Sequence, residues 1–361
     1  MIGIKDFRNA KCMGFDPTIK SMLFVVLGVL ALILMIPISC VSSRNPSFAE
    51  KEKIPVIFDT DICDDIDDTW ALALLVQSPE LDIKLITTEV GNTSAKARTV
   101  AKFLQVVGRA NIPIGIGIQN HENAHRQDGW AKDYQLSSYP GKIYKDGVQA
   151  IIDTIMASRR RVTVIAVGPT PNVASALERE PRIALKADFI GMQGSIRRGY
   201  AGVFEPTAEY NVRAYVKASQ RVFTAAWPMT ITPLDTCGIV DLSGEKYRKM
   251  LQRNSPLTIA LMENYRAWYR QGLLDEKRNI DQGELSRKLA EQVDNKSTTL
   301  FDTVAVYLAI TTELVKMEQL PVKVTDDGRT RIDPAGKVVN CATEWKDLSA
   351  FQDFLVGRLT K

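Results

Sequence analysis

From Ile54 onward, short apolar runs typical of buried strands alternate with longer segments of helical periodicity. Strands separated by helix-length connections pair in parallel, because a tight hairpin cannot join parallel strands. The pattern therefore predicts an α/β fold, a doubly wound and mostly parallel sheet flanked by helices. The predicted strands are 55–58, 83–88, 112–116, 162–167, 189–193 and 229–232, and the predicted helices are 68–77, 95–107, 147–157 and 171–178.

The C-terminal part of the chain has a different pattern. Short strand-like runs are separated by Asp327-Gly328 and Ala335-Gly336, which are turn dipeptides. They predict a small antiparallel meander followed by a final helix at 349–359. No repeat and no linker rich in Pro, Gly or Ser interrupts the chain after Ile54, so residues 51–361 are expected to form one domain. The meander strands are expected at 321–325, 330–333 and 337–341.

Residues 1–50 are predicted to form a separate signal or anchor segment. Residues 22–38 are almost uninterrupted apolar sequence, and basic residues precede them. This pattern indicates export to the cell envelope, with three readings left open. Cys40 after Ser39 resembles a bacterial lipoprotein processing site, the apolar stretch itself fits an uncleaved membrane anchor, and Ser47-Phe48-Ala49 fits a cleavage site for soluble export.

Composition excludes other classes of protein. With 45% hydrophobic residues among 361, the chain can bury a large core. Lys plus Arg minus Asp plus Glu is 46 − 42 = +4, too small a surplus for a nucleic-acid surface. Cys63, Cys237 and Cys341 form no C-x-x-C pair and are expected to be small buried hydrophobes. The sequence does not fix the oligomeric state and is compatible with a homo-oligomer.

A dense carboxylate cluster follows the first predicted strand, with six aspartates between Asp59 and Asp68. Two carboxylates about 4 Å apart repel by roughly 4 kcal/mol at an effective dielectric of 20. A helix N-terminus returns only about 0.3–1 kcal/mol per anion. A bound divalent cation, raised pKa values or splaying of side chains into water would offset the repulsion. Oxygen ligands without His or Cys favour Ca²⁺ or Mg²⁺ over a transition metal.

The segment from Asp59-Thr-Asp61 to Asp67-Asp68-Thr-Trp-Ala-Leu resembles the aspartate fingerprint of the inosine-uridine-preferring nucleoside hydrolases. Further segments resemble that family in order and spacing, over about residues 54–312. They are Thr87-Thr-Glu-Val-Gly91-Asn92, His125-Arg-Gln-Asp128-Gly-Trp, Gly168-Pro-Thr-Pro171-Asn, Met192-Gln-Gly194, Glu209-Tyr-Asn211-Val and Phe301-Asp302-Thr-Val-Ala-Val.

The resemblance implies a Ca²⁺-dependent enzyme that hydrolyses the N-glycosidic bond of a ribonucleoside or related N-riboside, releasing base and ribose. By the same resemblance, the metal ligands are Asp61, Asp68, Asp302 and the carbonyl of Pro171. Asp61 also takes the proton of the attacking water. The implied substrate-binding residues are Asp67, Asn92, Met192, Glu209 and Asn211.

Three departures from the family pattern concern the leaving-group acid, a contact to the ribose and the alignment of the first motif. Phe301 stands where the family has the His that acts as leaving-group acid, and Val203 stands where it has an Asn that contacts the ribose. The first motif is also two residues longer than its shortest form, so Asp64 or Asp65 competes with Asp67 or Asp68 for the assigned roles. His125 is the candidate replacement acid, since its ordinary pKa near 6.5 suits proton transfer at neutral pH.

Two other classes of function stay open. Phe58-Asp59-Thr60-Asp61 also resembles the nucleophile motif of haloacid-dehalogenase-like phosphatases, although Cys63-Asp64 follows where that family has Thr or Ser and an apolar residue. The absence of His before Asp302 is compatible with an exported nucleoside- or metal-binding protein that has lost catalysis. Release of free base from a nucleoside separates the hydrolase from both alternatives.

Overall fold

The computed structural model describes residues 52–277 and 279–361. The predicted export segment, including the apolar stretch and Cys40, lies outside the described residues. Among the helices that are described, none combines the length and apolar character needed to cross a membrane.

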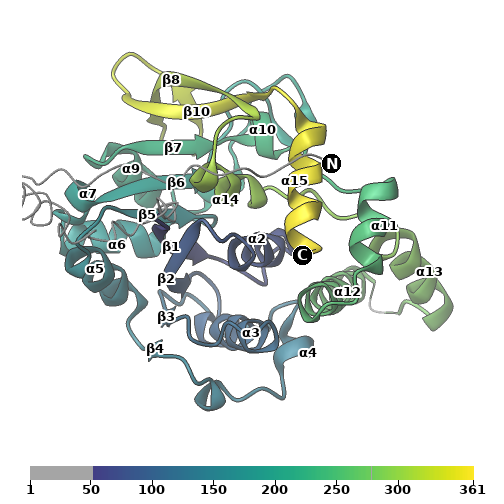
Figure 1. The fold of residues 1–361 in the computed structure, drawn as a ribbon. Coiled ribbons are helices and arrows are strands. Elements are labelled where there is room, and N and C mark those ends of the chain that lie inside the picture. The colour runs from purple at the N-terminus through teal and green to yellow at the C-terminus, as the bar shows by residue number, and fades with distance from the viewer. Residues whose placement is uncertain (1–51, 278) are drawn as a thin grey trace, which may run out of the picture. The chain divides into compact units, whose positions relative to one another are not determined.

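The described strands form one ten-stranded sheet (Figure 1). The pairs from β4 to β7 and the pair β7–β10 are parallel, whereas β10–β8 and β8–β9 are antiparallel. In sheet order the strands are β4 (Ile143–Tyr144), β3 (Ile114–Ile116), β2 (Leu81–Thr88), β1 (Ile54–Thr60), β5 (Val162–Ala166), β6 (Ala187–Met192), β7 (Met229–Thr232), β10 (Lys337–Trp345), β8 (Val315–Val324) and β9 (Thr330–Ile332).

This topology confirms the predicted doubly wound fold. The first strand lies inside the sheet, the next three extend the sheet to one side, and β5 then begins the other side. The order therefore reverses between β1 and β5, and such a switch point is where open α/β sheets bind ligands. The antiparallel pairing of the C-terminal strands is also confirmed, but the predicted meander order is wrong, because β10 pairs with β8 and β7 and not with β9. These strands extend the main sheet, with β8 between β10 and β9.

Helices cover both faces of the sheet (Figure 1). The elements α2, α3, α12, α14 and α15 pack over one hydrophobic core, and α5, α6 and α9 pack over a second. The helices are α2 (Asp67–Val76), α3 (Thr93–Val106), α4 (Asp128–Ala131), α5 (Gly147–Ala157), α6 (Pro171–Arg179), α7 (Ile183–Lys186), α8 (Tyr210–Ala214), α9 (Val216–Thr224), α10 (Leu234–Cys237), α11 (Gly244–Gln252), α12 (Pro256–Glu276), α13 (Gln282–Val293), α14 (Thr303–Ile310) and α15 (Leu348–Leu359).

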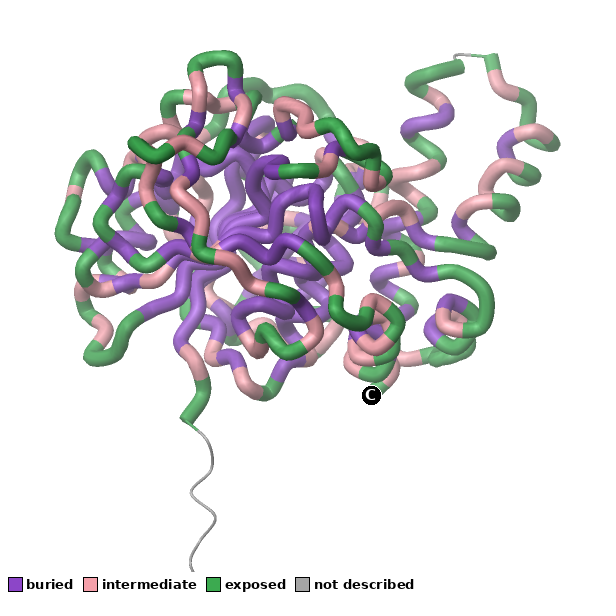
Figure 2. Tube along the Cα trace, turned by 90° about the horizontal axis from the view of Figure 1, so that it is seen from above, coloured by how far each residue is buried: buried purple, intermediate pink, exposed green. Residues whose placement is uncertain are grey.

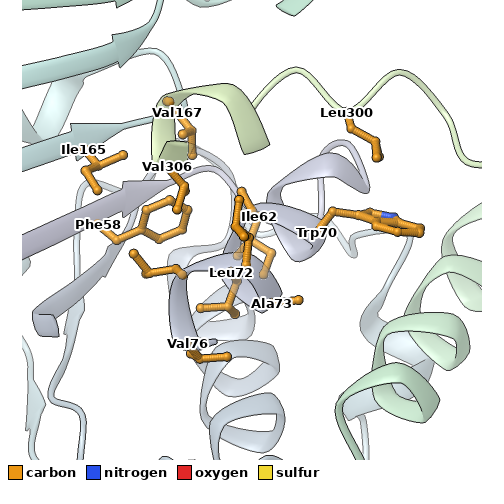
Figure 3. Close-up of a cluster of buried hydrophobic side chains, with 14 of the residues drawn as sticks. Phe58, Ile62, Trp70, Leu72, Ala73, Val76, Ile165, Val167, Leu300 and Val306 are labelled. Carbon is orange, nitrogen blue, oxygen red and sulfur yellow. The ribbon is translucent and has the colours of Figure 1, made fainter. Parts of the chain in front are cut away.

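Side chains of the central strands alternate between the two cores, as the pleat requires. Phe58 points into the core under α2 and α14, whereas its neighbour Ile57 points into the core under α5 and α6. Figure 2 shows buried residues concentrated at the centre and exposed residues around the rim. In Figure 3, Phe58 lies among side chains from α2 and α14, including Leu72 and Val306. This packing fixes the start of both helices beside the end of β1.

Candidate active site

The N-terminal ends of α2 and α14 bring three acidic side chains together beyond the end of β1. Carboxyl oxygens of Asp67, Asp68 and Asp302 lie within 4.8 Å of one another, and all three residues are buried. The N–H of Asp302 donates to Asp67 Oδ2 at 3.3 Å, and the hydroxyl of Thr60 donates to Asp68 Oδ1. Because every residue of α2 is buried, its first two aspartates cannot turn into bulk water.

Burial has a large electrostatic consequence in this cluster. Desolvation and the neighbouring aspartates raise the pKa values of Asp67, Asp68 and Asp302 well above the ordinary range. Burial also raises the pKa of Asp61 to about 7, although Lys96 opposes that shift. Three buried carboxylates without a basic side chain among them offer the all-oxygen donor set that hard divalent cations take. The residues present therefore fit a metal ion of the Ca²⁺ or Mg²⁺ type.

The aspartate cluster forms one side of a cavity of about 260 Å³. The sequence-predicted residues Asp61, Met192, Glu209 and Asn211 lie on the same cavity. The full lining comprises Asp61, Asp64, Asp65, Asp67, Asp68, Val167, Met192, Tyr200, Glu209, Tyr210, Asn211, Phe301 and Asp302. The structure thus places Asp67 in close contact with Asp68 and Asp302, with Asp61 beside them.

Glu209 and Asn211 are held rigidly at the start of α8. Glu209 Oε2 accepts the N–H groups of Gly194 and Val212 at 2.9 and 3.2 Å, and its Oε1 accepts the N–H of Asn211 at 2.6 Å. Burial nevertheless raises the pKa of Glu209 to about 7. The Asn211 amide donates to the carbonyls of Val167 and Met192 at 2.8 and 3.1 Å. Both side chains are therefore fixed before any ligand arrives.

A buried lysine behind the cluster was not predicted from the sequence. Lys96 on α3 is fully buried, and its Nζ donates to the carbonyl of Asp61 at 2.7 Å and to that of Glu89 at 3.2 Å. The same Nζ pairs with Asp64 Oδ2 at 2.9 Å. Asp64 consequently belongs to this ion pair, which separates it from the three-aspartate cluster.

Two further acidic residues, for which no role was predicted, lie close to each other and to Asp61. Asp59 and Glu89 are both fully buried, and burial raises both pKa values. Glu89 Oε1 accepts the N–H of Thr170 at 3.0 Å, which holds Thr170 at a left-handed φ of 68° just before Pro171. A Cβ on Gly168 would lie 2.5 Å from Glu89 Oε1 and 2.7 Å from Asp61 Oδ1. Only glycine lets this turn approach the carboxylates so closely.

Three sequence-predicted residues do not line the cavity. Pro171 is buried at the start of α6, and the Asn92 side chain caps α3 by accepting the N–H of Ala95 at 3.0 Å. His125 is buried, with Nε2 accepting the N–H of Asn92 at 3.1 Å and Nδ1 lying 3.3 Å from Asp64 Oδ1. Both ring nitrogens are thus engaged. Roles for these residues in catalysis or binding stay predictions.

The aromatic residues at the cavity come from two separate segments. Tyr200 lies edge-on to Phe301 with ring centroids 6.0 Å apart, and its hydroxyl accepts the N–H of Tyr210 at 2.9 Å. Trp227, by contrast, stacks on Phe189 in the core, with ring centroids 5.3 Å apart.

The cysteines Cys63, Cys237 and Cys341 are unbridged and buried, as predicted.

The fold and site define a doubly wound α/β enzyme with an acidic centre at the switch point of its sheet. The family profile described as "Inosine-uridine preferring nucleoside hydrolase" matches residues 56–352. The chain belongs to this family of N-ribosyl hydrolases. The match leaves no support for the phosphatase alternative.

Individual relatives agree with the family assignment. The chain is 28% identical over 228 residues to the non-specific ribonucleoside hydrolase RihC of Klebsiella pneumoniae, covering 60% of this chain and 73% of that protein. It is 34% identical over 187 residues to the inosine-uridine preferring nucleoside hydrolase of Leishmania major, covering 47% and 57% respectively. A solved plant nucleoside hydrolase has the same fold, with a TM-score of 0.69, 22% identity and coverage of 85% of this chain and 99% of that chain.

Proposed function

We propose that this chain hydrolyses the N-glycosidic bond of a ribonucleoside or related N-riboside in a Ca²⁺-dependent reaction. The observation that carries the proposal is the Asp67, Asp68 and Asp302 cluster, which shares one cavity with Glu209 and Asn211. One cavity thus contains metal-type ligands and groups that can bind sugar hydroxyls. The nucleoside hydrolase relatives support the same reaction.

Asp61, Asp68 and Asp302 would hold the ion, together with the Pro171 carbonyl, and Asp67 lies within the same cluster. When bound, the ion supplies positive charge that lowers the pKa of a water and orients ribose hydroxyls. The donor set fits Ca²⁺ because all of its ligand atoms are carboxylate or carbonyl oxygens, which hard divalent cations prefer.

The chain's own residues supply the remaining chemistry. Asp61, whose pKa burial raises to about 7, accepts the proton of the attacking water. The water oxygen bonds to C1′ as the C1′–N bond breaks, and that electron pair leaves with the base. Positive charge develops on the sugar, and the surrounding carboxylates stabilise it electrostatically. Asp67, Glu209 and Asn211 hold the ribose in the orientation that in-line attack requires.

The test measures base release by the purified full-length chain, with inosine, uridine and p-nitrophenyl riboside as substrates. Exhaustive chelation is expected to abolish release, and Ca²⁺ is expected to restore it better than Mg²⁺. Full activity after chelation would overturn the metal dependence. If no riboside releases its base in the presence of Ca²⁺, a binding protein without catalysis is the better description.

We also propose that the chain is exported to the cell envelope and anchored there through its N-terminal segment or a lipid on Cys40. The apolar stretch at residues 22–38 and the small residue before Cys40 support this location. Fatty-acid labelling that disappears in Cys40→Ser would support the lipid anchor. Membrane association without label would support the apolar stretch as the anchor, and release of a soluble chain would overturn anchoring.

A further inference from the structure

The cavity is acidic to an unusual degree. Of its thirteen lining residues, seven carry carboxyl groups and none is Lys, Arg or His. Lys96 is the cation in contact with the acidic loop, but it is fully buried behind that loop, on Asp64 and two carbonyls. Even with one bound divalent cation, the seven carboxyl groups of the lining outnumber the positive charges, and a cationic ligand favours the ionised form of these groups. A positively charged ligand is therefore favoured over a neutral or anionic one.

The lining also contains aromatic residues. Tyr200, Tyr210 and Phe301 border the cavity, and the hydrogen bond from the Tyr210 N–H to the Tyr200 hydroxyl ties the two tyrosines together. Both tyrosines line the cavity and keep part of their surface open to solvent, with Tyr200 41% exposed and Tyr210 47% exposed. Aromatic faces attract cations, with about 0.5–2 kcal/mol per contact.

Among the described residues, no His, Lys or Arg lies beside this aromatic wall. His125 has both ring nitrogens engaged outside the lining. Burial raises the pKa of Tyr200 to about 12, which makes its phenol a weak acid. Glu209 accepts three backbone N–H groups and is arranged as an acceptor. A neutral purine nucleoside therefore finds no imidazole beside the wall that could protonate its leaving base.

We propose that the preferred substrates are N-ribosides whose base carries a positive charge, such as N-alkylated purine ribosides or pyridinium ribosides. The inference rests on the proposed function and specifies its substrate class. In such a substrate the C1′–N bonding pair neutralises the base as it leaves, so no acid is needed. Water adds to C1′ and one proton is released to Asp61, which balances the reaction as cationic riboside plus water giving ribose, neutral base and H⁺.

The experiment compares matched substrates with the purified full-length chain and Ca²⁺. Guanosine and 7-methylguanosine differ by one methyl group and the positive charge that it brings. The p-nitrophenyl riboside is uncharged, and its p-nitrophenolate leaves without needing a proton. The expected kcat/KM for 7-methylguanosine exceeds that for guanosine by at least about 100-fold, the scale of one missing general acid. The expected KM for nicotinamide riboside, a pyridinium riboside, is at least tenfold below that for p-nitrophenyl riboside.

A variant pair tests whether the aromatic wall recognises the charge. Tyr210→Leu is expected to raise the KM for nicotinamide riboside by about 3- to 10-fold, with a smaller rise for p-nitrophenyl riboside. Phe204→Leu is the matched control, because Phe204 is 82% exposed, lies under Arg198 and does not line the cavity. Equal KM changes for the two substrates in Tyr210→Leu would overturn recognition of charge by this wall.

The outcomes separate this inference from the proposed function. If guanosine and p-nitrophenyl riboside are hydrolysed and 7-methylguanosine is no faster than guanosine, the substrate class is wrong and the hydrolase proposal stands. If no riboside is hydrolysed in the presence of Ca²⁺, the hydrolase proposal fails and this inference fails with it.

Discussion

The N–H of Asp302 donates to Asp67 Oδ2 at 3.3 Å, although 235 positions separate the two residues in the chain. Asp67 begins α2, and Asp302 immediately precedes α14. The two helices contact each other through the apolar core that includes Leu72 and Val306. The geometry of the acidic cluster is therefore set by the packing of α2 against α14. Because that packing is apolar, replacing one carboxylate is expected to leave the fold unchanged.

Asp302→Asn is expected to weaken Ca²⁺ binding at least tenfold and to lower kcat/KM by about 10²–10⁴-fold, because it removes one hard anionic ligand. Calorimetric titration with Ca²⁺ and base release from p-nitrophenyl riboside measure the two effects. The matched control is Asp82→Asn on β2, where the carboxylate is 43% exposed and pairs with Lys84. Unchanged Ca²⁺ affinity in Asp302→Asn would remove this residue from the ligand set.

Lys96→Met is expected to lower the free energy of unfolding by about 3–5 kcal/mol, the usual cost of removing one partner of a buried ion pair. The substitution leaves the Asp61 and Glu89 carbonyls without their donor and leaves Asp64 without its cation. Urea denaturation measures the loss. Lys84→Met is the control, since Lys84 is 46% exposed and its surface pair contributes little. A loss below about 1 kcal/mol in Lys96→Met would mean that the pair is not important for stability.

The central strands and the helices beside them were predictable because their patterns are local. Alternating apolar runs and turns fixed β1, β2, β5, β6 and β7 to within a few residues. The α14 helix was not predicted. Its residues Thr303 to Ala309 are all buried and none is charged, so the sequence shows no amphipathic period. The helices α8, α9, α12 and α13 were also not predicted. Length is not the reason, since α6 has nine residues and was predicted, whereas α12 has 21.

The candidate site was predictable only where motifs mark it. Asp67, Asp68 and Asp302 were brought together by the family resemblance, because nothing local joins residues so far apart. Lys96 and Glu89 were missed, because charged residues are normally exposed and their burial follows from tertiary packing. Lys96, one turn into α3, has no sequence signal of its own. Glu89 lies directly after β2 within the motif of residues 87–92, but no role was predicted for it.

The titration of Glu209 is expected to make the free energy of unfolding depend on pH. Burial raises its pKa from 4.5 to about 7, so the folded chain binds this proton more tightly than the unfolded chain does. The resulting stabilisation is full below about pH 4.5 and is lost as the pH rises to about 7, by roughly 3 kcal/mol at 1.4 kcal/mol per pKa unit. Urea denaturation at pH 5 and pH 7 without divalent cations measures it. Glu209→Gln cannot titrate, and a decline as steep as that of the wild type would assign the effect to other groups.

His125→Ala distinguishes a positioning residue from a leaving-group acid. The ring accepts the N–H of Asn92 and contacts Asp64, and a Cβ on Gly91 would lie 2.6 Å from its Cε1. Removing the ring should therefore disturb the Gly91–Asn92 turn and Asp64 together. We expect kcat to fall by a similar factor, about 3- to 10-fold, on guanosine and on p-nitrophenyl riboside, with a loss of about 1–2 kcal/mol in the free energy of unfolding. If His125 were the leaving-group acid, kcat would fall by about 10²–10⁴-fold on guanosine and hardly at all on p-nitrophenyl riboside.

His121→Ala is the control, because His121 is exposed and its ring centroid lies 5.9 Å from that of His125. The selective loss would restore His125 as the acid and would count against cationic bases as the preferred leaving groups.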